Sequence, residues 1–96
     1  MRRRIWTTRA SMYRCAIDFV AVATRVGAAL PRGEAELKDQ LKRACISVPL
    51  NIAESSGKNV GADRARYLTI ARASSLECGA ILGALYSRES LRCLPR

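Results

Sequence analysis

Residues 68–85, LTIARASSLECGAILGAL, carry the pattern that decides the fold. Apolar or small residues recur there at alternating intervals of three and four residues, and we call this row of residues the seam. Its members are Leu68, Ala71, Ser75, Cys78, Leu82 and Leu85. This heptad spacing is typical of a helix that packs along its length against another helix. Small residues in the middle of the seam allow a neighbouring backbone to approach closely. The sequence therefore predicts one long bundle helix, which begins near Ala62 or Asp63 and ends near Tyr86.

Two further helices are predicted before this seam. The first covers about residues 10–29 and has an apolar stripe at Met12, Ala16, Phe19, Val20, Ala23, Val26 and Leu30. The second covers about residues 34–56 and continues with apolar residues at Leu37, Leu41, Ala44, Val48 and Ile52. Turn-forming residues separate the helices at 31–33 and 55–61. Three consecutive helices with short connections predict a helical bundle.

The ends of these helices complete the predicted fold. Gly57 follows the second helix and suits a left-handed helix cap. After Tyr86 the apolar residues are few, so Ser87–Arg96 provides at most two turns of a fourth helix. We therefore expect an all-α fold, an antiparallel up-down bundle of three long helices plus a truncated fourth.

Pro49 lies inside the second predicted helix. A proline there removes one backbone donor and presses on the carbonyl of Cys45, which costs about 3 kcal/mol in an isolated helix. The apolar pattern nevertheless continues through Leu50, Ile52 and Ala53. We therefore predict one kinked helix, with Ser47 as a local hydrogen-bond partner, and a break at Pro49 as the alternative.

The composition limits the chain to one small domain and excludes several enzyme classes. The chain has 96 residues and a formal net charge of +9, and it contains no histidine. A chain of this length buries only about 60–65% of the surface that its unfolded form exposes, so a partner subunit is plausible. Without histidine, the commonest general base and the usual imidazole metal ligand are both missing. We expect no enzymatic activity, no cofactor and no metal site.

The cysteines and the hydropathy indicate a protein of the reducing cytoplasm. Cys15, Cys45, Cys78 and Cys93 are far apart in the sequence and form no C-x-x-C pair, so we interpret them as buried thiols, with a four-cysteine zinc site as the minor alternative. No apolar run approaches the roughly 20 residues of a membrane span. No signal peptide is apparent, because charged residues interrupt the apolar stretch that follows the first arginines.

The first nine residues differ from the rest of the chain in charge. No acidic residue precedes Asp18, whereas five arginines do. We expect a basic N-terminal arm at residues 1–9, followed by the helical bundle domain at residues 10–96. Such an arm fits a solvated tail, a nucleic-acid-binding arm or a mitochondrial presequence.

Polar residues on the second and third helices are candidates for structural roles. Glu54 and Glu77 have no nucleophile or second carboxylate at a spacing suited to catalysis. A carboxylate near a helix contact requires a partner, so we expect both to link the second and third helices. The full set of expected structural polar residues is Ser47, Asn51, Glu54 and Glu77.

Three stretches resemble the bacterial four-helix-bundle family of 23S rRNA intervening-sequence proteins. They are DQLKRACISVPLNIAE at 39–54, ARYL at 65–68 and IARASSLEC at 70–78. The resemblance covers about residues 10–86 and implies an antiparallel bundle that assembles as a homopentameric ring. It also implies kinship with accessory proteins of diversity-generating retroelements, which engage a reverse transcriptase and nucleic acid. The chain departs from the family in its short C-terminus and in Ser55, where glycine is usual.

Two functional hypotheses follow, both for a non-enzymatic oligomeric protein. The first is non-specific binding of RNA or DNA through phosphate contacts. Its candidate residues are Arg2, Arg3, Arg4, Arg9, Lys42, Arg43, Lys58, Arg64, Arg66 and Arg72. The second is a structural or docking subunit, for example for a reverse transcriptase, in which an uncovered seam of Ile81, Leu82 and Leu85 receives a helix from elsewhere.

Overall fold

The computed structural model describes the backbone of residues 2–88 and the side chains of residues 10–88. Its elements are α1 (Arg2–Ala29), the 3-10 turn η1 (Arg32–Glu34), α2 (Ala35–Ser56) and α3 (Gly61–Ser87). No strand occurs in this described part, which confirms the all-α class. The two later helices lie where the hydrophobic periodicity predicts them, to within about two residues at each end.

The start of α1 corrects one expectation. The helix begins at Arg2 and not near residue 10. The reason is local, because the segment RRRIWTTRA contains no glycine or proline and arginine is a strong helix former. The side chains of Arg2, Arg3, Arg4 and Arg9 lie outside the described residues, so the division into a basic arm and a bundle domain stays a prediction. Residues 89–96, which include Cys93 and most of the expected short fourth helix, also lie outside them.

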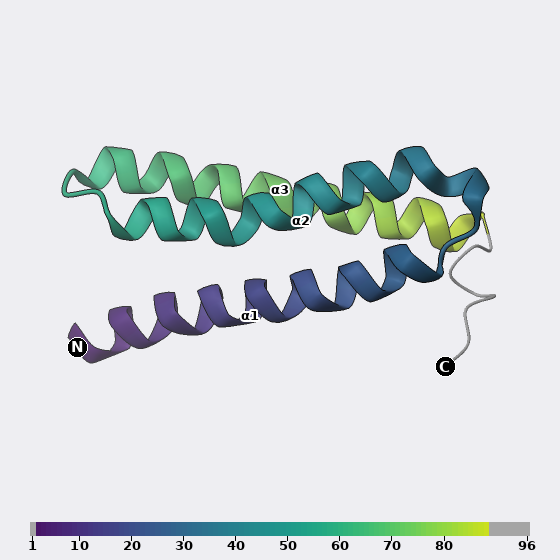
Figure 1. Ribbon diagram of the computed structural model, residues 1–96. Helices are drawn as coiled ribbons and strands as arrows, with labels where there is room; N and C mark the ends of the chain where they lie inside the picture. The colour runs from purple at the N-terminus through teal and green to yellow at the C-terminus, as the bar shows by residue number, and fades with distance from the viewer. Residues whose placement is uncertain (1, 89–96) are drawn as a thin grey trace.

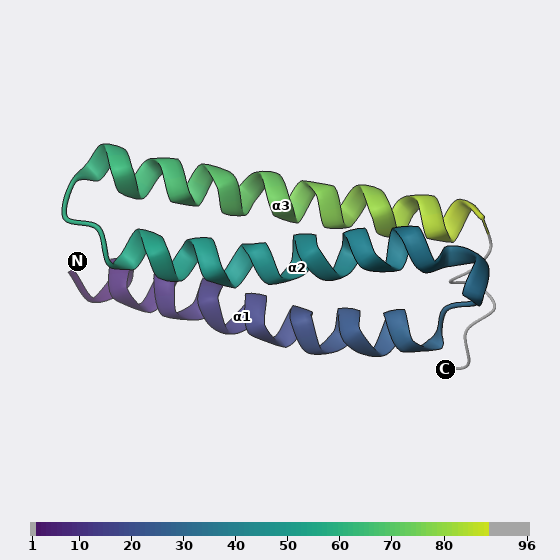
Figure 2. The ribbon, with the colours of Figure 1, turned by 45° about the horizontal axis from the view of Figure 1, so that its top comes forward.

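The helix α2 lies between α1 and α3 (Figure 2). It packs against both of them, whereas the backbones of α1 and α3 do not approach each other within the described chain. Figures 1 and 2 show that the chain reverses direction at η1 and again between α2 and α3, at the opposite end of the molecule. As a result α1 and α3 flank α2.

The core is narrow and consists mainly of small side chains. One cluster joins all three helices through Ala23, Leu41, Ala44, Cys45, Cys78, Ile81 and Leu85. A second cluster lies nearer the α2–α3 turn and contains Ala16, Val48, Ile52 and Ala71. Only five of these side chains are large aliphatic ones, and each contributes about 1.5–3 kcal/mol through burial.

The burial of α3 corrects the expected docking seam. Ile81 is 5% exposed and Leu85 is fully buried, because both face α2. Leu82 is only partly buried. The uncovered face of α3 is therefore not the seam of Ile81, Leu82 and Leu85 that the sequence suggested.

The helix α2 is continuous through Pro49, as predicted, and the alternative of a break there is wrong. The proline ring is buried against the rest of the bundle. The kink itself stays a prediction.

The end of α2 corrects the expectation of a left-handed cap. Gly57 has a right-handed backbone, with φ −85° and ψ −2°. Its amide donates to the carbonyl of Glu54 at 3.1 Å, and the amide of Lys58 donates to Ser55 at 3.3 Å. These tightened bonds satisfy the last carbonyls of the helix, so no left-handed residue is required.

Candidate functional site

An apolar groove occupies the space between α1 and α3. It has a volume of about 860 Å³, and Val48 and Ile52 of α2 form its floor. Its walls are Ser11, Met12, Cys15, Ala16 and Phe19 of α1, and Leu68, Ala71, Arg72, Ser75, Cys78, Gly79 and Leu82 of α3. We call this feature the α1–α3 groove. Arg72 is the charged residue of its lining.

The side of α3 that faces away from α2 is exposed and also apolar. We call it the outer face of α3 and define it by Ile70, Ala73, Leu76, Ala80 and Ala84, all of which are exposed. Leu76 is 67% exposed and Ile70 is 41% exposed. Glu77 lies on the same side of the helix, at the i+4 position from Ala73. Together with the groove, this face makes α3 apolar around most of its circumference.

The apolar character of α3 corrects the expectation that no segment approaches a membrane span. An 18-residue window of Gly61–Ser87 has a mean hydropathy of 1.3, and 28% of that window is buried. By length and composition alone, α3 is therefore apolar enough to cross a membrane. A core helix of a soluble bundle passes the same test, so the observation is weak evidence for a membrane protein.

A polar contact links α2 to α3 through hydroxyl groups. Ser74 donates to the hydroxyl of Ser47 at 2.8 Å. The side-chain amide of Asn51 donates to the carbonyl of Ser47 at 2.8 Å and to its hydroxyl at 3.0 Å. Of the four expected structural polar residues, Ser47 therefore makes the contact between the helices, and Asn51 supports it.

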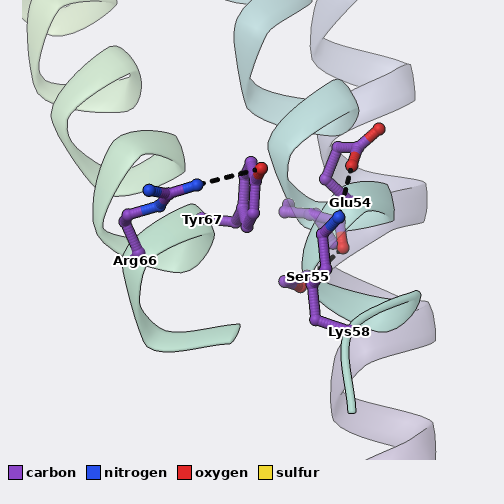
Figure 3. Close-up of polar contacts among 6 residues, drawn as sticks. Glu54, Ser55, Lys58, Arg66 and Tyr67 are labelled. Carbon is purple, nitrogen blue, oxygen red and sulfur yellow. Dashed lines mark hydrogen bonds and ion pairs between the residues drawn. The ribbon is translucent and has the colours of Figure 1, made fainter. Parts of the chain in front are cut away.

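The two glutamates of that set are placed differently from the expectation. Glu54 is exposed and pairs with Lys58 at 3.6 Å (Figure 3). Glu77 is exposed on α3. Within the described residues no hydrogen bond or ion pair joins either glutamate to the neighbouring helix. Both carboxylates lie near the surface, where water solvates them, so neither needs a partner on the other helix.

Basic and aromatic side chains meet at the turn between α2 and α3. The Nζ atom of Lys58 lies 5.2 Å from the ring centre of Tyr67, and the Arg66 guanidinium lies 5.0 Å from it. Arg66 also donates to the Tyr67 hydroxyl at 3.2 Å (Figure 3). Arg64 instead holds the turn, since its Nε donates to the carbonyl of Lys58 at 2.6 Å. We call Lys58, Arg64, Arg66 and Tyr67 the turn cluster.

Tyr67 was missed by the sequence reasoning, which counted charges alone. The available signal was an aromatic residue next to basic ones at the predicted start of a helix. Its partner Lys58 could not be assigned, because the cation–π contact forms only when the chain folds back at the turn.

The other expected nucleic-acid contacts are scattered over the molecule. Lys42 and Arg43 line a shallow hollow of about 500 Å³ on α2, together with Asp39, Ile46, Ser47, Leu50 and Asn51. Arg72 lies in the α1–α3 groove. The described basic residues of the set thus occupy three places: Lys42 and Arg43 share the hollow on α2, Arg72 lies in the groove, and the other three meet in the turn cluster.

The cysteines divide into two buried thiols and one exposed thiol. Cys45 and Cys78 are each 2% exposed, and desolvation raises the pKa of both. The thiol of Cys45 donates to the carbonyl of Lys42 at 3.2 Å. Cys15 is exposed on the wall of the groove, so the interpretation as a buried thiol is wrong for this residue. No group of His, Cys, Asp or Glu side chains in the described residues has the arrangement of a metal site.

Comparison with known proteins adds the family. The sequence matches the family described as 23S rRNA-intervening sequence protein over residues 8–92. This match includes all of α2 and α3 and most of α1. Neither the curated proteins nor the solved structures provide a match. Since the family match spans most of the sequence, the chain belongs to the 23S rRNA-intervening sequence protein family.

Proposed function

We propose that the chain is a non-enzymatic accessory subunit that assembles into an oligomer through the outer face of α3. The observation that carries this proposal is the exposed apolar surface of that helix, centred on Leu76 and Ile70. A helix that is apolar on nearly all sides is normally buried, because each exposed apolar side chain forgoes the free energy of leaving water.

The local charge is compatible with contact between copies. Between Tyr67 and Ser87, the charged residues of α3 are Arg72 and Glu77. Glu77 lies on the outer face, and Arg66 and Arg72 each stand one turn before a residue of that face, so the surface carries charges of both signs. The narrow core gives a second reason, since small domains often need subunit contacts to remain folded.

Light scattering coupled to gel filtration tests this proposal. We expect the wild-type protein to form a discrete oligomer and Leu76→Glu to dissociate it, because the new charge would be buried in the contact. Leu50→Glu is the matched control, since Leu50 is 59% exposed but lies on α2. A monomeric wild-type protein, or equal dissociation by both variants, would contradict the proposal.

A second function, non-specific binding of RNA or DNA, is supported by the turn cluster and the net charge of +9. Lys58 and Arg66 supply cations for phosphate groups beside a tyrosine ring, on which a base can stack. The four arginines of residues 2–9 add charge at the start of α1.

The salt dependence of oligonucleotide binding tests this second function. Replacing both Lys58 and Arg66 by glutamine should lower the affinity for single-stranded RNA or DNA and reduce the salt slope by about 1.4, or about 0.7 for each lost phosphate contact. Arg25→Gln, on an exposed part of α1, is the control. An unchanged salt slope would exclude the turn cluster as a phosphate-binding site. The same test on variants of Arg2, Arg3 and Arg4 would show whether the N-terminal arm binds phosphate groups.

Three remaining features of the proposal rest on the family resemblance: a pentameric ring, completion of an antiparallel four-helix bundle, and a reverse transcriptase or another protein as partner. A cytoplasmic location rests instead on the cysteine usage and the sequence pattern of the first residues. The alternatives are a purely structural docking subunit and a truncated remnant without independent function. The oligomer mass from light scattering distinguishes five subunits from other numbers.

A further inference from the structure

We infer that the thiols of Cys45 and Cys78 form a pair that small disulfide compounds oxidise to a Cys45–Cys78 disulfide, which joins α2 to α3. The inference concerns the core and not the outer face of α3, so it does not depend on the proposed oligomer. Three observations support it: the cluster that the two residues share, the register of the two helices, and the access to Cys78 from the α1–α3 groove.

The two cysteines lie in the same part of the core. Both belong to the buried cluster that joins the three helices, each is 2% exposed, and both are free thiols. Desolvation is the main cause that raises the pKa of the Cys78 thiol, and the Cys45 thiol is the next cause. Because such an electrostatic effect weakens with distance, it indicates that the two sulfur atoms lie near each other.

The register of α2 and α3 brings the two residues to nearly the same level. The 2.8 Å hydrogen bond between the hydroxyls of Ser47 and Ser74 places those two residues about opposite each other. The chain reverses direction between the helices (Figure 1), so Cys45, two residues before Ser47, lies at about the level of residue 76. Cys78 is then only about 3 Å further along the bundle, at 1.5 Å per residue.

The direction of helical side chains reduces this offset. A side chain leans towards the N-terminus of its own helix, so Cys45 and Cys78, on helices of opposite direction, lean towards each other. The bond of 3.2 Å from the Cys45 thiol to the carbonyl of Lys42 shows this lean directly. A disulfide requires Cα atoms about 4.4–6.8 Å apart, and small cluster residues such as Ala44 let the two backbones approach closely.

The α1–α3 groove gives reagents access to one of the two thiols. Cys78 is part of the groove lining, and Cys45 is not. The Cys78 thiolate attacks one sulfur of a small disulfide RSSR, such as oxidised glutathione, and one RS⁻ leaves. The Cys45 thiolate then attacks the Cys78 sulfur of this mixed disulfide, and the second RS⁻ leaves. The two thiol protons pass to the released thiolates, so one RSSR is consumed and two RSH are formed.

The disulfide is a covalent clamp on two of the three helices. It encloses the turn between α2 and α3 and restricts the unfolded chain more than the folded one, which stabilises the fold. In a reducing compartment such a bond is transient and responds to oxidants. The pair therefore makes the stability of the α2–α3 unit depend on the redox conditions.

A chain that keeps only the two core thiols tests the inference. Cys15→Ser and Cys93→Ser together leave Cys45 and Cys78 as the two thiols. This chain is equilibrated in glutathione buffers from both the reduced and the oxidised side, so slow access does not affect the result. Alkylation followed by mass spectrometry counts the remaining thiols. We expect both thiols to be lost together, with the loss of two hydrogen atoms, no bound glutathione and a Cys45–Cys78 link in the peptide map.

Moving one thiol along α3 is the matched control. Cys78→Ala combined with Ala71→Cys, in the same background, keeps two thiols at buried positions but places the second one two turns away, about 10 Å along the helix. We expect this variant to need a glutathione buffer at least about tenfold more oxidising to form its disulfide. The original pair in urea is a second reference that needs no further variant. The folded chain should hold the disulfide at least about tenfold more strongly than the unfolded chain.

Several outcomes would overturn the inference. They are equal glutathione buffers for the pair and the displaced control, a mixed disulfide as the end product, and a disulfide no stronger in the folded chain than in urea. A lower urea midpoint after oxidation would also contradict the clamp. Leu76→Glu separates this test from the proposed function, because it should dissociate the oligomer and leave formation of the disulfide unchanged.

Discussion

Ser74 occupies a buried position on α3 where the surrounding seam residues are mostly apolar. It is 9% exposed, and its hydroxyl donates to Ser47 across the contact with α2. Because a polar group at such a site requires a partner, the pair fixes the register of the two helices as well as contributing free energy. Ser75, the next residue, makes only a local bond to the carbonyl of Ala71.

Ser74→Ala should therefore lower the free energy of unfolding by about 1 kcal/mol more than Ser75→Ala. Both changes gain the same helix propensity, so the difference between them isolates the bond between the helices. Urea denaturation of the two variants measures that difference. Equal stabilities would show that the Ser47–Ser74 bond contributes nothing net.

The two buried thiols make the stability of the folded chain depend on pH. Desolvation raises the pKa of Cys45, and it raises that of Cys78 with additional contributions from nearby Cys45 and Glu77. The unfolded chain then loses its thiol protons at a lower pH than the folded chain. The resulting stabilisation is complete below the ordinary thiol pKa of 9.0 and is lost as the pH rises through the raised values.

We therefore expect the free energy of unfolding to be unaffected by these thiols well below pH 9.0 and to fall as the pH rises through 9.0 and above. The decline should be smaller when Cys45 and Cys78 are both replaced by alanine, although this variant is less stable at every pH because it leaves cavities. Cys15→Ser, with its exposed thiol, serves as the control and should keep the wild-type decline. Identical declines in the double variant and the wild type would contradict the prediction.

Among the helices, α2 combines an unfavourable residue with a central position. Pro49 removes a backbone donor in the interior of a helix, yet α2 continues through it. Packing against α1 and α3 outweighs the local cost, and the buried ring itself contributes apolar contact. The helix is thus maintained by tertiary contacts more than by its own propensity.

Pro49→Ala should raise the free energy of unfolding by about 1 kcal/mol. The gain of about 3 kcal/mol in helix propensity exceeds the roughly 1–2 kcal/mol lost with the buried ring. Urea denaturation measures the net change in the free energy of unfolding. Pro31→Ala is the control because Pro31 lies outside the long helices. A destabilised Pro49→Ala protein would mean that the ring or the bend it imposes is needed for packing.

The helices were predictable because their signals are local. The heptad of residues 68–85 and the turn-forming residues near 31–33 and 55–61 determine α2, α3 and the end of α1 without reference to the rest of the fold. The start of α1 was misplaced because the expectation relied on a change of charge, whereas helices are ended by residues such as glycine and proline.

The surfaces were less predictable, since they depend on how the helices are placed around one another. Periodicity could not distinguish Ile81 and Leu85, which face α2, from Leu82, which lines the groove. The contact of Lys58 with Tyr67 likewise forms only after the chain reverses. Single-helix patterns identify apolar faces but do not say which neighbour covers them.

For the whole molecule, the arrangement around α2 means that the three helices bury different amounts of apolar surface. The helix α3 shares most of the large buried side chains with α2, including Leu85 and Ile81. Among the described side chains of α1, only Ala16 and Ala23 are buried, and Phe19, Val20 and Val26 are partly covered. Stability within one fold follows the apolar area that each element buries, so α1 should open before α2 and α3 separate.

Amide hydrogen exchange at the level of single residues tests this order. We expect the central amides of α1 to exchange at least about tenfold faster than those of α2 and α3 under the same conditions. Equal exchange in all three helices of the free protein would instead mean that α1 opens only with the whole molecule, and that the two small core clusters act as one cooperative unit.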